Sequence, residues 1–203
     1  MSAEQHWDSA YTDKGVNERS WSEPGDCDAL IEFEFAQLDS DAAVIDVGGG
    51  ASTFAKSLQI RGYKNLAVLD VSKIALREAQ ESLGNRATEV EWIVSNILNW
   101  EPTRSYAYWN DRAVFHFLTK NEDQQKYIEK VVQATHAGSH VVIATFSPEG
   151  PESCSGLPVQ RWTQEGLASL FADTCSLLHS GKRDHITPWG STQSFSWVHL
   201  IRD

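Results

Sequence analysis

The stretch that most limits the possible folds of this chain is VIDVGGGAST, residues 44–53, where an apolar run ends in three consecutive glycines. A short apolar run that meets a glycine turn and then an amphipathic segment is typical of a buried strand leading into a helix. Glycine has no Cβ atom, so the turn can be tight and a ligand can approach its backbone. In an open α/β sheet, ligands bind beyond the carboxyl ends of the strands, where this turn would lie.

The same alternation of strand and helix patterns continues along the chain. The expected parallel strands are 42–47, 65–70, 90–94, 106–110 and 140–146, and the helices between and after them are 52–62, 73–83, 119–135 and 164–172. Ser52, Ser72, Thr119 and Thr163 are the expected residues at the helix starts.

The last two apolar runs, 175–186 and 193–202, are separated by a Pro/Gly turn without a helix, so they should pair antiparallel. We therefore predict an α/β fold: a doubly wound, mostly parallel, seven-stranded sheet, Rossmann-like, that ends in an antiparallel hairpin. A length of 203 residues suits a single domain over residues 1–203.

Charge and composition exclude several classes of partner. The formal net charge is −11 and no cluster of Lys and Arg is present, which opposes binding to nucleic acid or to an anionic membrane surface. The longest apolar runs are too short to span a membrane, and the polar N-terminus is unlike a secretory signal. Cys27, Cys154 and Cys175 form no CxxC pair, which favours reduced thiols in a cytoplasmic protein and gives no metal-ligand spacing.

Two classes of cofactor compete for the glycine turn. A dinucleotide fold needs G-x-G-x-x-G facing a pyrophosphate, but here Gly48 and Gly50 are followed by Thr53 in the third position. Asp46 would repel a pyrophosphate, whereas it suits the ammonium and sulfonium of S-adenosylmethionine (SAM). Asp70 ends the next strand and can accept hydrogen bonds from ribose hydroxyls in either class.

Four segments in order, VIDVGGGAST, VLDVS, VSNIL and WNDRAVFHFL, resemble the motifs of class I SAM-dependent methyltransferases, in particular small bacterial proteins with a methyltransferase domain. The resemblance covers nearly the whole chain, although Asn96 stands where the family commonly has Asp. It implies that SAM is bound by Asp46, Gly48, Gly49, Gly50, Asp70, Val71, Asn96, Ile97 and Asp111.

The N-terminal segment, residues 1–25, carries Trp7, Tyr11 and Trp21 outside the repeats. Similar enzymes use such a segment as a cover over SAM, so the resemblance implies a lid whose aromatic faces favour the sulfonium. The alternative is that these side chains pack the first helix onto the sheet.

Candidates for the methyl-acceptor side are His116, Arg161 and His185. His116 follows the fourth strand, either as a base of suitable pKa or as a packed core residue. The loop 147–162 would lie over the acceptor, where Arg161 would bind an anion or remain an exposed charge. His185 precedes a turn that would bring it back towards the site.

The sequence therefore predicts a cytoplasmic enzyme that moves a methyl group from SAM to a small-molecule thiol, hydroxyl or carboxylate and releases S-adenosylhomocysteine. The small-molecule acceptor is favoured because the chain has no obvious protein-docking domain. The alternatives are a protein lysine methyltransferase, an NAD(P)-dependent oxidoreductase and a non-catalytic SAM-binding regulator.

Overall fold

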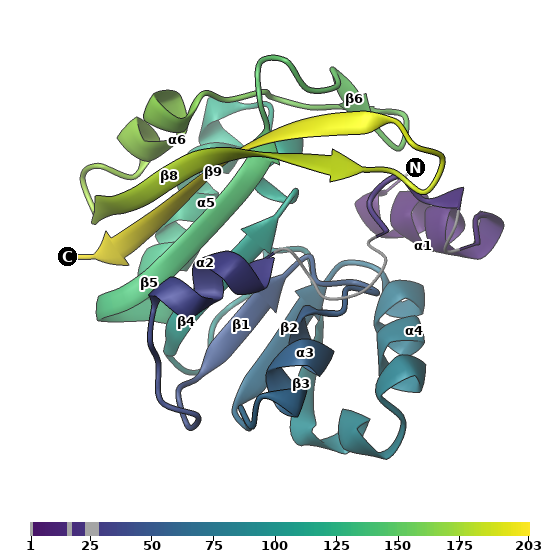
Figure 1. The fold of residues 1–203 in the computed structure, drawn as a ribbon, viewed down its shortest axis with the longest axis horizontal. Helices are drawn as coiled ribbons and strands as arrows, with labels where there is room; N and C mark the ends of the chain where they lie inside the picture. Colours follow the sequence, from purple (N-terminus) through teal and green to yellow (C-terminus); the bar gives the residue numbers. More distant parts are fainter. Residues whose placement is uncertain (1, 16–17, 23–28) are drawn as a thin grey trace.

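The computed structural model of this protein describes residues 2–15, 18–22 and 29–203. A seven-stranded sheet runs through its middle in the order β3-β2-β1-β4-β5-β9-β8 (Figure 1). The strands are β1 (Val44–Val47), β2 (Leu66–Asp70), β3 (Val90–Val94), β4 (Tyr106–Arg112), β5 (Thr135–Phe146), β8 (Cys175–Ile186) and β9 (Thr192–Arg202). The strands β1 to β5 are parallel, and β9 is antiparallel to both β5 and β8. The predicted fold class is confirmed.

Helices pack on both faces of this sheet (Figure 1). One face carries α2 (Ala29–Phe35), α3 (Phe54–Ile60) and α4 (Lys73–Leu83), and the other carries α5 (Asn121–Ala134) and α6 (Gln164–Leu170). The first helix, α1 (Ala3–Asp13), lies beside α4 rather than against the sheet. Short 3-10 helices, η2 (Gly84–Glu89) and η3 (Phe115–Phe117), follow α4 and β4.

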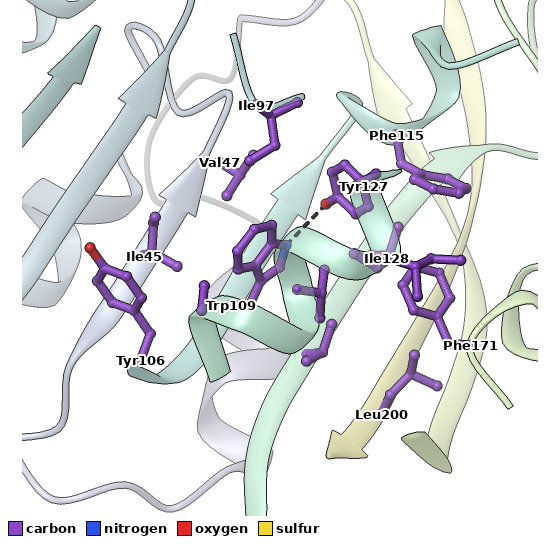
Figure 2. Packing of buried hydrophobic residues seen from close by; sticks show 14 of the residues in the cluster. Ile45, Val47, Ile97, Tyr106, Trp109, Phe115, Tyr127, Ile128, Phe171 and Leu200 are labelled. Carbon is purple, nitrogen blue, oxygen red and sulfur yellow. Dashed lines mark hydrogen bonds between the residues drawn. The ribbon is translucent and has the colours of Figure 1, made fainter. Parts of the chain in front are cut away.

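Alternating side chains along the strands divide the core into two clusters, one on each face of the sheet. In β1, Ile45 and Val47 belong to the cluster under α5 and α6, whereas Val44 belongs to the cluster under α2 and α3. Within the first cluster the indole Nε1 of Trp109 donates a 3.0 Å hydrogen bond to the hydroxyl of Tyr127 (Figure 2). The sheet is therefore covered on both faces, and the candidate site lies at the carboxyl ends of β1, β2 and β4.

The predicted helix starts are only partly correct. Ser72 and Thr163 cap α4 and α6, because each side chain accepts a hydrogen bond from a backbone N–H of the first turn. The helix α5 begins after Lys120 and not at Thr119, whose own N–H still bonds to the preceding 3-10 turn.

The predicted acceptor-side loop, residues 147–162, is partly structured. It contains a two-stranded hairpin of β6 (Ser153–Cys154) and β7 (Leu157–Pro158), and the Cys154 side chain is buried. Cys27 and part of the predicted lid segment, residues 1, 16, 17 and 23–25, lie outside the described residues. Within the described ranges, every helix is too short or too polar to cross a membrane.

Candidate active site

A cavity of about 250 Å³ lies beyond the carboxyl ends of β1, β2 and β4. The glycine turn after β1, the ends of β2 and β4 and the turn after β3 form its walls, and N-terminal residues cover it. The predicted site residues that line it are Asp46, Gly48, Gly49, Asp70, Val71, Asn96, Ile97, Trp7, Tyr11 and Trp21. The structure therefore brings most of the predicted cofactor-side residues into one cavity.

The glycine turn is close-packed against the groups that surround the cavity. Gly48 and Gly50 have φ angles of +67° and +42°, which side-chain-bearing residues rarely adopt. A Cβ atom on Gly49 would lie 2.5 Å from Oδ2 of Asp46, and one on Gly50 would lie 2.6 Å from the hydroxyl of Tyr11. Gly50 is thus needed for the turn and for the approach of Tyr11, although it is not itself among the lining residues.

Asp46 is held in a fixed orientation on β1. Its Oδ1 accepts a 2.7 Å hydrogen bond from Nδ2 of Asn110, its register partner on β4, and its Oδ2 accepts a 2.8 Å bond from Oγ of Ser52. Thr53, and not the predicted Ser52, takes the N-cap position of α3, although Oγ of Ser52 also accepts a 3.4 Å hydrogen bond from the backbone N–H of Phe54. The two hydrogen bonds to Asp46 give an oriented carboxylate at the cavity wall.

Asp70 is the last residue of β2 and is 8% exposed. Its Oδ1 accepts a 2.7 Å hydrogen bond from the backbone N–H of Ser72. Burial is the main cause that raises its pKa to about 7; the backbone N–H of Ser72 opposes that rise and the nearby charge of Asp46 adds to it. Hydroxyl donors from a ligand would favour the ionised form of this carboxylate.

The turn after β3 forms the third wall. Asn96 lines the cavity, and its Oδ1 accepts a 2.9 Å hydrogen bond from the backbone N–H of Leu98, which fixes the turn. Ile97 presents a buried apolar side chain, and the N–H of Ser95 bonds to the carbonyl of Asp70 at 3.0 Å. This wall offers an apolar surface beside polar backbone groups.

The N-terminal segment covers the cavity with aromatic rings. The indole Nε1 of Trp21 donates a 3.1 Å hydrogen bond to the hydroxyl of Tyr11. Trp7 packs edge-on against Trp21 and against Phe117, with ring centroids 5.6 Å and 5.2 Å apart. Burial raises the pKa of Tyr11, so this hydroxyl stays protonated near neutral pH.

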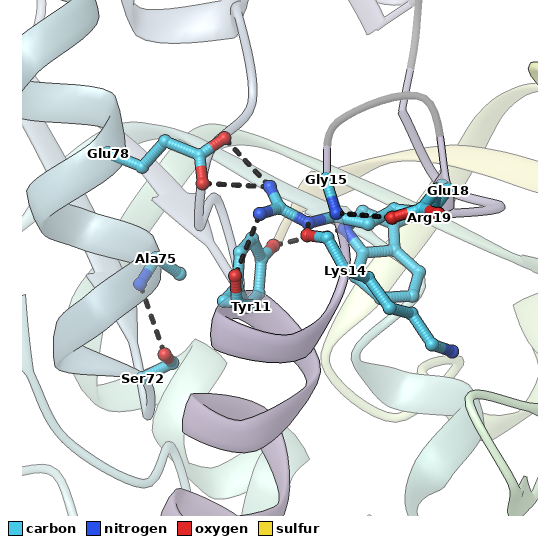
Figure 3. A network of polar contacts seen from close by, with 9 residues as sticks. Tyr11, Lys14, Gly15, Glu18, Arg19, Ser72, Ala75 and Glu78 are labelled. Atoms are coloured by element: carbon cyan, nitrogen blue, oxygen red, sulfur yellow. Dashed lines mark hydrogen bonds and ion pairs between the residues drawn. The ribbon is translucent and has the colours of Figure 1, made fainter.

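Arg19 fastens this cover to α4 (Figure 3). Its Nη1 contacts both carboxylate oxygens of Glu78 on α4, at 2.7 and 2.8 Å, and its Nη2 and Nε donate 2.9 Å hydrogen bonds to the carbonyls of Tyr11 and Lys14. A second attachment joins Oγ of Ser72 to Oδ1 of Asp8 at 2.6 Å. The cover is therefore attached to the start and the middle of α4.

Asp111 does not line the cavity. It is fully buried, and it accepts hydrogen bonds from the backbone N–H groups of Val114 (2.7 Å) and Phe115 (3.1 Å) and from the hydroxyl of Tyr127. Burial raises its pKa to about 7, and the hydroxyl of Tyr127 opposes the rise. The structure thus places Asp111 behind the site, where it positions Val114 beside Gly48.

The three predicted acceptor-side residues are also absent from this cavity. His116 is fully buried, its Nδ1 accepts a 3.5 Å hydrogen bond from the backbone of Phe146, and burial lowers its pKa to about 3. This geometry agrees with the packed-core alternative. Arg161 instead holds its own loop together: it pairs with Glu152 at 2.9 Å and donates to the carbonyl of Pro148 at 2.9 Å.

His185 lies at a second, smaller cavity of about 30 Å³, enough for about one water molecule. Its Nε2 donates a 2.6 Å hydrogen bond to the carbonyl of Ser20. Asn110 and Arg112 line both cavities and so form the partition between them. His185 is therefore near the acceptor side but behind this partition.

Several lining residues were not among the predicted site residues, namely Arg19, Glu78, Asn110, Arg112, Val114, Phe117 and Cys154. The sequence could have predicted Asn110 and Arg112 together, because residues two apart on a strand point to the same face of the sheet. Cys154 belongs to the loop 147–162 that the sequence places over the acceptor, whereas Arg19 and Glu78 had no such signal, since they meet through a tertiary contact.

The walls fit an adenosyl cofactor that carries an amino-acid end. The glycine turn brings its backbone to the cavity wall through Gly48 and Gly49, and Asp46 supplies a carboxylate for an ammonium group. Asp70 supplies an acceptor for hydroxyl groups, and Ile97 supplies an apolar wall for a base. The described lining shows no Lys or Arg at the glycine turn to neutralise a pyrophosphate.

Comparison with known proteins gives matches to methyltransferases. Residues 44–138 match the family model of a methyltransferase domain. EEF1A lysine methyltransferase 2 from Danio rerio is 24% identical over 185 residues, 84% of this chain and 74% of that protein.

Solved structures match the whole fold. N-methyltransferase NodS from Bradyrhizobium japonicum WM9, in complex with S-adenosyl-l-homocysteine, has a TM-score of 0.71 and 13% identity, covering 96% of this chain and 97% of that one. A structure on the conversion of a disulfide bond into a thioacetal group during echinomycin biosynthesis has a TM-score of 0.78 and 19% identity, covering 98% and 93%. At these identities, the structural likeness establishes the fold.

Proposed function

We propose that the chain is a class I SAM-dependent methyltransferase whose methyl acceptor is a small molecule bound beneath the N-terminal cover. The sequence resemblance and the match of residues 44–138 to a methyltransferase-domain family model support the methyltransferase assignment. The observation that carries this proposal is the covered cavity. Trp7, Trp21 and Phe117 close it over the end of β4, and Cys154 adds a buried thiol from the loop 147–162. A compact acceptor fits this space, whereas a large one would need the cover to move away.

The cofactor side divides among three strand ends. Asp46 and the turn Gly48–Gly50 bind the amino-acid end, Asp70 and Val71 bind the ribose, and Asn96 with Ile97 binds the adenine. SAM supplies an electrophilic methyl group on a sulfonium. Asp111 acts as a positioning residue, because it fixes the backbone of the segment after β4 that faces this methyl group.

The cover excludes water and orients the acceptor. Methyl transfer is a displacement at carbon, so alignment and removal of solvent provide much of its rate. The attachment of Arg19 to Glu78 holds α1 closed over Asp70, and aromatic faces of Trp7 and Trp21 favour a neighbouring cation. The described part of the predicted lid, residues 2–15 and 18–22, therefore acts as the cover, and the loop 147–162 closes the acceptor side through Cys154.

A protein lysine methyltransferase is the second candidate, because the similar Danio rerio protein carries that name. A lysine side chain of a folded protein would have to reach under the cover, between Trp21 and Phe117. The NAD(P)-dependent oxidoreductase alternative has no support from the family model, and a non-catalytic SAM-binding regulator would transfer no methyl group.

The test has two parts. First, titration calorimetry with SAM and with NADH should give binding heat for SAM alone, and Asp70→Ala should weaken SAM at least tenfold, the scale of a lost charge-assisted hydrogen bond. The matched control is Asp173→Ala, which removes an exposed carboxylate after α6. An unchanged SAM affinity in Asp70→Ala would reject the ribose role.

Second, SAM with a labelled methyl group is incubated with the protein and with cell extract separated into small-molecule and protein fractions. We expect label in the small-molecule fraction. Label in the protein fraction would favour the lysine candidate, and SAM binding with no transfer to either fraction would favour the regulator.

A further inference from the structure

The part of the described cavity lining that follows Asn110 along the chain carries one positive charge. Of the described lining residues that follow Asn110 along the chain, Arg112 is the one with a charged side chain; the others are Ala113, Val114, Phe117, Leu118 and Cys154. An arginine keeps its charge at any physiological pH. The surface that the acceptor meets is therefore apolar, with one fixed cation.

Arg112 is placed by contacts on two sides. It is the last residue of β4, its Nη1 donates a 3.3 Å hydrogen bond to the carbonyl of Trp21, and its guanidinium carbon lies 5.4 Å from the ring centroid of Phe195. Burial raises the pKa of the Cys154 thiol to about 11, although the guanidinium of Arg112 opposes that rise. The cation thus belongs to the cavity wall between the cover and the loop 147–162.

No described residue at this end of the cavity is placed to remove a proton from an acceptor. The thiol of Cys154 is protonated at neutral pH, and both oxygens of Asp46 already accept hydrogen bonds. Asp70 lies two strands away from β4, roughly 10 Å at the usual strand spacing. His116 and His185 do not line this cavity. An acceptor that arrives already deprotonated needs none of these groups.

We propose, building on the methyltransferase function above, that the acceptor is a small carboxylic acid bound as its carboxylate by Arg112, with its apolar body against Trp7, Trp21 and Phe117, and that the product is its methyl ester.

The chemistry balances without a base. One carboxylate oxygen forms the bond to the methyl carbon, the carbon–sulfur bond breaks, and its electron pair stays on the sulfur of S-adenosylhomocysteine. No proton moves, because a carboxyl group with an ordinary pKa near 4 is already ionised at pH 7. The second carboxylate oxygen can stay paired with Arg112 and so orient the first.

The same charges disfavour the other acceptor types. An amine or a lysine side chain is an ammonium at pH 7, so it would be repelled by Arg112 and by the sulfonium and would also have to lose a proton. Alcohols and ordinary thiols are protonated at pH 7 and would likewise need a base. A carboxylate instead lies between two cations.

The test measures binding to the complex of the protein with S-adenosylhomocysteine. The probes are phenylacetate and indole-3-acetate, each paired with its neutral primary amide, and the readout is titration calorimetry. We expect each acid to bind roughly 10- to 100-fold more tightly than its amide, the range for one charge-assisted pair. Arg112→Gln should abolish that preference when the variant is titrated after saturation with S-adenosylhomocysteine. Arg86→Gln, an exposed arginine in η2, should keep it.

Equal binding of acids and amides to the wild-type complex would overturn the proposal, as would a preference that survives in Arg112→Gln. The product gives a separate readout, because alkali releases the label of a methyl ester as volatile methanol. Labelled product that is stable to alkali would also overturn the proposal. Failure of the protein to bind S-adenosylhomocysteine would instead count against the methyltransferase function, so the two failures are distinguishable.

Discussion

Asp70→Asn should stabilise the protein and weaken its cofactor binding at the same time. The carboxylate is buried at the end of β2, where its pKa is raised from 3.8 to about 7. At about 1.4 kcal/mol for each pKa unit, ionising Asp70 in the folded protein costs about 4 kcal/mol of folding free energy. Asparagine keeps the shape and hydrogen-bonding capacity of the side chain but carries no charge.

The direction of the pH dependence follows from that raised pKa. The folded protein holds the Asp70 proton more tightly than the unfolded chain does, so this contribution to stability is fully present below pH 3.8. It is lost as pH rises to about 7, and above that pH it stays lost. The pKa of Asp111 is also raised to about 7, so Asp111 makes stability depend on pH in wild type and in the variant alike. Its contribution cancels when the two free energies of unfolding are subtracted, and the difference reports Asp70.

Urea denaturation at pH 4, 5.5, 7 and 8.5 provides the assay. The free energy of unfolding of Asp70→Asn minus that of wild type should grow between pH 4 and 7 by several kcal/mol, at most about 4, and then level off. The control Asp173→Asn, at an exposed position, should show no such growth. Parallel curves for Asp70→Asn and wild type would refute the argument that burial holds the Asp70 proton.

Further variants test other parts of the site. Gly49→Ala places a methyl group 2.5 Å from Oδ2 of Asp46, so it should cost roughly 1–3 kcal/mol by urea denaturation and weaken SAM binding by calorimetry. Arg19→Met removes the paired guanidinium and leaves Glu78 unpaired, so hydrogen exchange in α1 should accelerate and SAM should dissociate faster, in contrast to an exposed-site control such as Arg86→Gln. His116→Gln should lower stability, but between pH 5 and 8 it should leave the shape of the pH–activity profile unchanged, because the pKa of His116 is lowered to about 3.

The order of strands and helices is predictable from the sequence because it depends on local patterns. Apolar runs, glycine turns and helix caps act within a few residues, and the sheet that they predict is the one observed. The predicted helix start at Ser52 lies one residue before the observed N-cap, Thr53, and the Ser52 hydroxyl both donates to the buried carboxylate of Asp46 and accepts from the N–H of Phe54. Local propensity identifies a helix start to within one or two residues.

The two halves of the site differ in predictability for the same reason. The cofactor half is built from residues at the ends of β1, β2 and β3, and sequence position alone puts them at one edge of the sheet. The cover is different, because Arg19 and Glu78 are 59 positions apart and meet only after α1 docks beside α4. No local pattern in either segment encodes that pair.

Of the two arginines Arg161 and Arg112, the structure places only Arg112 in the lining of the cavity. Arg161 lies in the long loop after β5, where the sequence offers it as an anion-binding residue, but its guanidinium binds the carbonyls of Pro148 and Gly150 and the carboxylate of Glu152. Arg112 ends β4, two residues after Asn110, whose side chain bonds to Asp46. Because side chains two apart share a face of the sheet, the contact that orients Asp46 also directs Arg112 to the same side of β4. The cation of the acceptor end is thus set by strand register, and a change that shifts β4 by one residue would remove Asn110 and Arg112 from the site together.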